Sequence, residues 1–191
     1  RVEDTSSLSS YFPTKRAGKL CYFTSGRSFD LPLRDLLNEC HSGFKKEPNC
    51  ETATYNWYSS CNQRSVVAAV RQGLSHLLFV TKYHGQLREY HGRYFVTGWF
   101  EIGSVGTVAG RTFIKAKTMV FTDIENAYEI TPERWRMICP GTKCGQLTNL
   151  RWATQVISGD LLEKICEQLY PNNKITEYIQ QIEEIKRSLF R

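Results

Sequence analysis

The sequence predicts a mixed α/β fold of the α+β type, in which a small curved β-barrel or sheet is flanked by helices and followed by a C-terminal helical extension. Three segments rich in apolar, β-branched and aromatic residues predict neighbouring strands over residues 77–82, 94–102 and 112–122. The tail of the chain repeats apolar residues at helical spacing instead. The chain has 191 residues, of which 41% are hydrophobic and 23% charged, so it can bury the core of one globular domain.

The first half of the chain alternates strand and helix signals. Residues 1–18 are polar and end in the basic turn PTKRAG, which predicts a loose polar leader. We expect a strand over residues 19–24 and a short helix over residues 31–40, where several leucines share one face. We expect a second helix over residues 65–72, because Gly73 provides a C-cap.

Two further helices are expected at the C-terminal end. Ser158 can cap the first, whose apolar side chains continue to Leu169, and Pro171 then breaks it. The last helix carries isoleucines and a leucine on one face. The domain is therefore expected to span residues 19–170, with residues 171–191 forming a helix that packs on it or extends it.

The chain is moderately basic, with a formal net charge of +6 and a pI of about 9.0. A basic excess favours a nucleic-acid partner, although a basic protein that binds no polyanion fits the same charge. No run of 18 apolar residues is present, so no membrane partner is expected. The segment RVEDTSSLSS lacks the apolar core of a signal peptide, which predicts a cytoplasmic, intracellular protein.

The seven cysteines predict reduced, buried thiols rather than a disulfide framework or a metal site. Four residues separate Cys139 from Cys144, and nine and ten residues separate Cys40, Cys50 and Cys61. Neither spacing matches the paired C-x-x-C pattern of structural zinc sites, so no metal and no cofactor is expected. Pairing of Cys139 with Cys144 in a disulfide stays open.

Catalytic motifs are absent from the sequence. The four histidines show no H-E-x-x-H spacing, and no G-x-S-x-G, P-loop or dinucleotide-binding glycine pattern occurs. A bare E-x-K at Glu184 and Lys186 lies in the predicted last helix, without the strand that a nuclease site needs. No catalytic residue is therefore predicted. An enzyme that acts on a flipped base or a phosphodiester through His84, His91 and Glu89 remains an alternative.

Several segments, taken in order, resemble those of EVE domains and the related YTH domains, two branches of the PUA-like superfamily. The segments similar to EVE domains are KLCYFTSGRSFDLPLRDLL, YNWYSSCNQRSVVAAVRQG and LLFVTKYHG. The segments similar to YTH domains are GRTFIKAKTMVFTDI and LTNLRWATQVIS. The resemblance covers about residues 19–170, and it implies a PUA-like barrel.

The same resemblance implies a non-catalytic reader that flips a methylated base out of its stack into an aromatic pocket. N6-methyladenine in DNA is the base that it favours, with 5-methylcytosine, 5-hydroxymethylcytosine or an RNA base as the alternative. Such domains often serve as targeting modules of McrB-type modification-dependent restriction systems in bacteria and archaea, fused to a motor or a nuclease. A PUA-like protein-interaction domain without catalysis stays open as well.

A base pocket needs aromatic walls and a polar group that reads the base edge. Stacking on an aromatic side chain contributes about 1–3 kcal/mol per base, and a buried methyl group adds about 0.8 kcal/mol. By their position in the resemblance, Trp57 is the expected wall and Asn62 the expected edge reader. A hydroxyl or backbone amide from the first turn and two tyrosines from the loop at 83–93 complete the expected pocket: Ser25, Thr24, Tyr83 and Tyr90.

Phosphate contacts are expected from basic side chains near the same segments. Alternation along residues 113–117 puts Lys115 and Lys117 on one face of a strand, although a solvated strand face explains either lysine as well. Phosphates supply much of the affinity for nucleic acid without reading its sequence. The full set of expected backbone contacts is Arg64, Arg111, Lys115, Lys117 and Arg151.

Overall fold

The structure is a computed structural model, and it describes the chain over residues 7–27, 29–42, 46–57, 63–141, 145–152 and 155–189, with the backbone alone at 149, 151 and 152. The strands of this part are β1 (Ser7–Ser10), β2 (Lys15–Tyr22), β3 (Thr54–Tyr55), β4 (Leu74–Lys82), β5 (Tyr94–Val108), β6 (Arg111–Phe121), β7 (Tyr128–Ile130) and β8 (Val156–Ser158). Its α-helices are α1 (Leu36–Ser42), α2 (Gln63–Arg71), α3 (Pro132–Ile138), α4 (Gly159–Leu169) and α5 (Ile175–Leu189).

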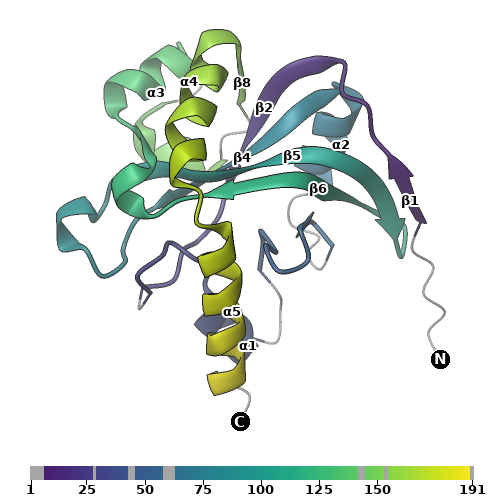
Figure 1. Ribbon diagram of the computed structural model, residues 1–191. Helices are drawn as coiled ribbons and strands as arrows, with labels where there is room; N and C mark the ends of the chain where they lie inside the picture. Colours follow the sequence, from purple (N-terminus) through teal and green to yellow (C-terminus); the bar gives the residue numbers. More distant parts are fainter. Residues whose placement is uncertain are drawn as a thin grey trace.

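The strands form one mixed sheet in the order β3-β6-β5-β4-β2-β8, and β1 and β7 also pair with β5. Only the β2–β4 pairing is parallel among the described strands. The long strand β5 is shared, because its first half pairs with β4 and its second half with β1. Register shifts at Phe79/Val80 and near Ile102 bend the sheet strongly (Figure 1). The prediction of a mixed α/β fold is therefore confirmed.

Two hydrophobic cores cover the two faces of the sheet. Leu77 and Phe79 belong to the core that contains Tyr178 of α5, whereas Leu78 and Val80 belong to the core that contains Trp135 of α3. Figure 1 shows α3 and α4 on one side of the sheet and α1 and α5 on the other. Because both faces of β4 are buried, its central residues 77–80 are continuously apolar rather than alternating.

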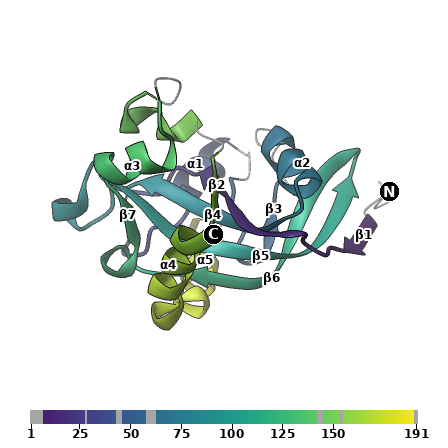
Figure 2. The same cartoon turned by 90° about the horizontal axis from the view of Figure 1, so that it is seen from above.

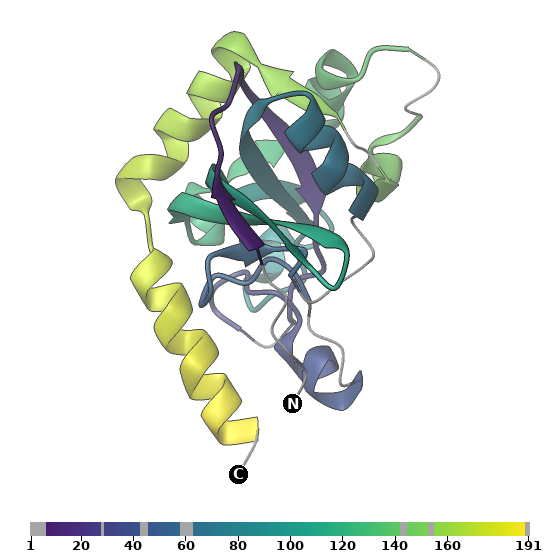
Figure 3. The same cartoon turned by 90° about the vertical axis from the view of Figure 1, so that its right-hand side faces the viewer.

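Helix α4 and helix α5 follow each other along one side of the molecule (Figure 3). Four apolar side chains of α4 are buried, and the short helix η4 (Tyr170–Asn172) joins it to α5. On α5, Tyr178 and Ile182 are the buried residues. The C-terminal helix expected within residues 171–191 thus packs on the domain through its apolar face.

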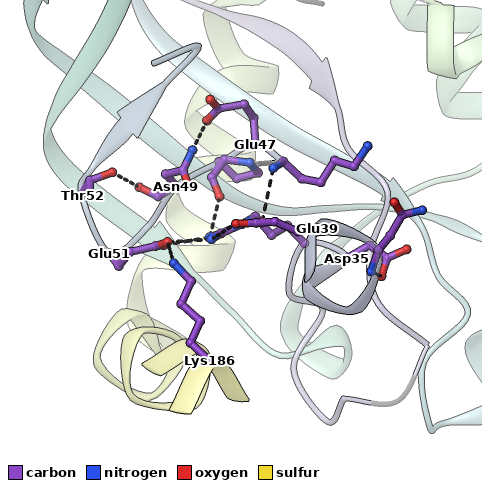
Figure 4. A network of polar contacts seen from close by, with 11 residues as sticks. Asp35, Glu39, Glu47, Asn49, Glu51, Thr52 and Lys186 are labelled. Carbon is purple, nitrogen blue, oxygen red and sulfur yellow. Dashed lines mark hydrogen bonds and ion pairs between the residues drawn. The ribbon is translucent and has the colours of Figure 1, made fainter. Parts of the chain in front are cut away.

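A buried ion network holds the first helix, the 46–51 segment and α5 together (Figure 4). The guanidinium of Arg34, which is 2% exposed, donates to Glu39 at 2.8 Å and to Glu51 at 2.6 Å. Lys186 of α5 also donates to Glu51, at 2.8 Å. Because Arg34 forms this network and an isolated bridge with Ser25, the helix expected over residues 31–40 begins only at Leu36.

The described part of the predicted polar leader differs from expectation. Ser7–Ser10 pairs with β5, and β2 already begins at Lys15, so strand structure starts before residue 19. The side chains of β1 are all exposed, and a strand that buries no side chain carries no apolar alternation that sequence analysis can detect. Helix α2, in contrast, ends where predicted, with Gly73 at a φ of 70°.

Cys139 is disulfide-bonded, whereas Cys21, Cys40, Cys50 and Cys166 are free thiols. Cys144, whose pairing with Cys139 the sequence leaves open, lies outside the described residues. Among the helices that the structure describes, none is both long and apolar enough to span a membrane.

Candidate nucleic-acid interface

Acidic residues are missing from the two stretches that build one face of the molecule. The chain contains no Asp or Glu between Glu51 and Glu89, and none between Glu101 and Asp123. These stretches form β3, α2 and β6, which lie together because α2 and β3 both contact β6. We call the surface of α2, β3 and β6 the α2–β6 face (Figure 2). Every formal charge on these three elements is positive.

Asn56 joins the two elements that carry the predicted phosphate contacts. Its side chain is fully buried, and Nδ2 donates to the carbonyl of Thr112 at 2.9 Å and to Oε1 of Gln63 at 3.2 Å. Gln63 precedes Arg64, and Thr112 follows Arg111. The backbone at Asn56 has a φ of 71°, a conformation that asparagine adopts more readily than most residues. Asn56 therefore ties the start of α2, where Arg64 lies, to the start of β6, where Arg111 lies.

Trp57 lies on the same face, directly after Asn56. Its ring meets that of Phe113 edge to face, with 4.2 Å between the centroids, and Trp57 itself is half-buried. The pairing of β3 with β6 sets Thr54 opposite Lys115, whose side chain is exposed. The structure thus brings together four of the predicted site residues: Trp57, Arg64, Arg111 and Lys115.

A hollow of about 480 Å³ runs along the exposed side of α2. Its walls combine apolar side chains with amide and guanidinium donors from Gln63, Arg64, Val67, Ala68, Arg71 and Gln72. Guanidinium groups donate in a planar fork that matches two phosphate oxygens at once. The hollow can therefore bind the anionic backbone of a nucleic acid.

Lys117 shares the exposed edge of β6 with Lys115 but has a partner. Its ammonium group lies 3.0 Å from a carboxylate oxygen of Glu101. In the pairing of β5 with β6, Thr118 and Ala116 have partners in β5 but Lys117, between them, has none. Lys117 therefore lies at an irregularity of the pairing. Both lysines are exposed, and within the described part of the chain Lys115 forms no ion pair.

The other expected pocket residues lie at the end of the parallel strands β2 and β4. Ser25 is 6% exposed, and its hydroxyl accepts a hydrogen bond from Thr81 at 3.1 Å. Tyr83 is 1% exposed, and its hydroxyl accepts from the backbone of Leu87 at 3.1 Å. These side chains are buried parts of the fold. Thr24 is exposed, and its carbonyl accepts from Asp35.

Tyr90 is half-buried beside this second group. Its ring packs against those of Tyr83 and Phe95, with centroids 6.4 and 5.9 Å away. His91, one of the alternative catalytic residues, places a ring nitrogen 2.5 Å from the carbonyl of Gly85, which closes the loop. The expected single pocket is thus divided between Trp57, which follows β3 and packs against Phe113 of β6, and the tyrosines at the end of β4. Sequence order alone does not reveal this division, because it depends on which strand β3 pairs with.

Asn62, the expected edge reader, lies outside the described part of the chain. Of Arg151 the structure describes only the backbone, in the short helix η3 (Leu147–Trp152). No sequence motif points to Asn56, Gln63, Arg71 or Phe113. The absence of acidic residues over 52–88 and 102–122 is the signal that points to this face in the sequence.

No protein-family model, no curated protein and no solved structure matches this chain. The chemistry of the α2–β6 face therefore carries the functional argument.

Proposed function

We propose that this protein is a nucleic-acid-binding reader that uses the α2–β6 face. The observation that carries the proposal is the double hydrogen bond of Asn56, which joins the start of α2 to the start of β6, two elements whose formal charges are all positive. A polyanion meets attraction there from several cations and repulsion from no carboxylate of the same elements.

Phosphate binding on this face follows from the kind and spacing of its donors. Each cation that neutralises a phosphate releases condensed counterions, which is a sequence-independent gain in free energy. Arg64 and Arg71 line the hollow of α2, and Arg111 and Lys115 extend the cationic surface onto β6. Such contacts position a strand over the face and leave recognition to other groups.

Trp57 supplies the group that recognises a base. Its edge-to-face contact with Phe113 holds the ring in one orientation, so less side-chain freedom is lost when a base stacks on it. A methylated base adds apolar area to the stack, about 0.8 kcal/mol for one methyl group. We propose N6-methyladenine in DNA as the favoured base, with modified cytosines or an RNA base as the alternative.

The strongly bent mixed sheet and its flanking helices support a PUA-like barrel as the finer description of the fold. We also propose that the protein is intracellular and comes from a bacterium or archaeon. The proposal also includes a targeting role in a modification-dependent restriction system, with fusion to a motor or nuclease.

The test is a fluorescence-anisotropy titration with matched oligonucleotides at two salt concentrations. The set contains unmodified, N6-methyladenine and 5-methylcytosine strands, as DNA and as RNA. We expect the tightest binding for one modified base, and we expect Trp57→Ala to abolish that preference while weak, salt-sensitive binding remains. A Trp57→Ala protein that discriminates as well as the wild type contradicts the role of Trp57. If no oligonucleotide binds, the α2–β6 face serves a protein partner instead.

A further inference from the structure

A second pocket lies away from Trp57, between the sheet and the C-terminal helices. Its volume is about 420 Å³. Strands β2, β4 and β5 form its floor, through Arg16, His76, Trp99 and Glu101. Helices α4 and η4 form the opposite wall, mainly through Glu163, Glu167 and Tyr170. The size falls within the range of small-ligand sites in proteins.

One tautomer of His76, at the floor of this pocket, satisfies every contact of the neighbouring Ser75 hydroxyl. A serine hydroxyl can donate one hydrogen bond and accept two. The hydroxyl of Ser75 donates to the carbonyl of Ala17 at 3.2 Å and accepts from its amide at 3.1 Å. The remaining contact, 2.6 Å to Nδ1 of His76, is then satisfied when Nδ1 carries the proton and donates. In this tautomer, Nε2 of His76 is a hydrogen-bond acceptor.

Aromatic rings form the apolar part of the pocket. Trp99 is 6% exposed and meets His76 edge to face, with 5.3 Å between the ring centroids. Its indole nitrogen is buried and has no hydrogen-bond partner among the described residues. Tyr170, which is 64% exposed, stands at the opposite wall on η4. A ligand between these walls can contact the faces or edges of both rings.

The charge of the pocket is opposite to that of the whole chain. Its lining contains three carboxylates, those of Glu101, Glu163 and Glu167, against the one guanidinium of Arg16. Glu163 pairs with Arg16, and Glu101 pairs with Lys117 at 3.0 Å. Within the described part of the chain, Glu167 forms no ion pair. The lining thus has excess negative charge on a protein whose net charge is +6.

We propose that this pocket binds a small organic cation that carries N–H donors, an alkylammonium or a guanidinium group. The cation donates to Nε2 of His76 and to the carboxylate of Glu167, and its alkyl part packs against Trp99 and Tyr170. Aromatic rings next to carboxylates favour such cations, because the faces of the rings carry partial negative charge. The same charge repels phosphates, so the site is distinct from the α2–β6 face.

The protonation of His76 agrees with this assignment. Burial, followed by the charge of Arg16, lowers the pKa of His76 to about 4. The imidazole is therefore neutral near pH 7, where it accepts a hydrogen bond and does not repel a cation.

An NMR titration of the whole chain tests the proposal with simple probes. The indole N–H signal of Trp99, identified by its loss in Trp99→Phe, and the ring signals of His76 report on the pocket. We expect putrescine and methylguanidinium to shift these signals saturably, whereas tetramethylammonium, which has no N–H donor, binds more weakly. Acetate should shift nothing. If a lysine-containing peptide binds more strongly than putrescine, the cation that the pocket recognises is a protein side chain rather than a free amine.

Two matched variants separate the pocket from general charge effects. Glu167→Gln should weaken the binding of putrescine about 2–5-fold, the usual scale for one exposed ion pair. Glu177→Gln removes an exposed carboxylate of α5 outside the pocket and should leave the binding constant unchanged. The proposal is overturned if no cation shifts the Trp99 and His76 signals, if tetramethylammonium binds as tightly as putrescine, or if both variants have the same effect.

Discussion

At the scale of single residues, Asn56 connects the fold to the proposed function. It is fully buried, it follows β3, and its one amide group holds the start of α2 and the start of β6 at a fixed separation. Its side-chain oxygen has no hydrogen-bond partner among the described residues, so the donor group makes the whole contribution. The contact joins the two elements that carry the charges of the α2–β6 face, although Asn56 itself is not accessible to a ligand.

Replacing Asn56 by Asp keeps the size of the side chain but exchanges the donor for an acceptor. The new oxygen would face the carbonyl of Thr112 and Oε1 of Gln63, and a buried charge would lack a partner. We expect Asn56→Asp to lower the free energy of unfolding by at least about 2 kcal/mol. Urea denaturation measures this, with Asn38→Asp on the exposed side of α1 as the control. Equal stability of the two variants would contradict the importance of the Asn56 contacts.

His76 makes stability depend on pH in a defined window. Its folded-state pKa of about 4 lies below the ordinary 6.5, chiefly because of burial. The unfolded chain therefore binds the proton more readily, and stability falls as the pH drops from 6.5 towards 4, by up to about 3 kcal/mol. Urea midpoints at several pH values should show a smaller decline in His76→Gln than in the wild type. A His41→Gln control, at an exposed position, should follow the wild type.

At the scale of elements, the network around Arg34 fixes α5 to the domain. Burial acts to raise the pKa of Glu51, but the hydrogen bonds and charge of Arg34 outweigh it and lower that pKa to about 2. Because the folded-state pKa is depressed from 4.5, this stabilisation is complete above about pH 4.5 and is lost as the pH falls towards 2. The packing of α5 thus depends on an ion network as well as on Tyr178 and Ile182.

Removing the carboxylate of Glu51 leaves Arg34 and Lys186 with one partner fewer. We expect Glu51→Gln to reduce the free energy of unfolding by about 3 kcal/mol, since a buried charge loses a partner. Guanidinium denaturation gives the difference from the wild type. Glu177→Gln, an exposed change on α5, should cost much less, and a similar loss in both would argue against the network.

At the scale of the whole molecule, the sequence predicts the centre of the sheet better than its edges. β4, β5 and β6 were predictable because their segments are apolar and β-branched, and the end of α2 because Gly73 follows it. β1 was not predictable, since its exposed serines show no alternation. The contact of Trp57 with Phe113 could not be predicted either, because it arises from the pairing of β3 with β6.

The separation of charge over the molecule leads to a prediction about salt. The α2–β6 face offers four cations, Arg64, Arg71, Arg111 and Lys115, while the pocket at Trp99 has excess negative charge. If all four contact phosphates, the logarithm of the binding constant should fall with the logarithm of the salt concentration with a slope of about −3 to −4. Anisotropy titrations over a salt series measure the slope. A slope near zero would mean that nucleic acid does not bind through these charges.

The most direct test of the α2–β6 face compares two double variants in one nucleic-acid binding measurement. Arg64→Gln with Arg111→Gln removes one cation from each of the two elements that Asn56 joins. Arg136→Gln with Arg187→Gln removes the same charge from exposed positions on α3 and α5. We predict that the first pair weakens binding and reduces the salt slope by about 2, whereas the second leaves both close to the wild-type values. Equal losses in the two double variants would contradict the assignment of this face.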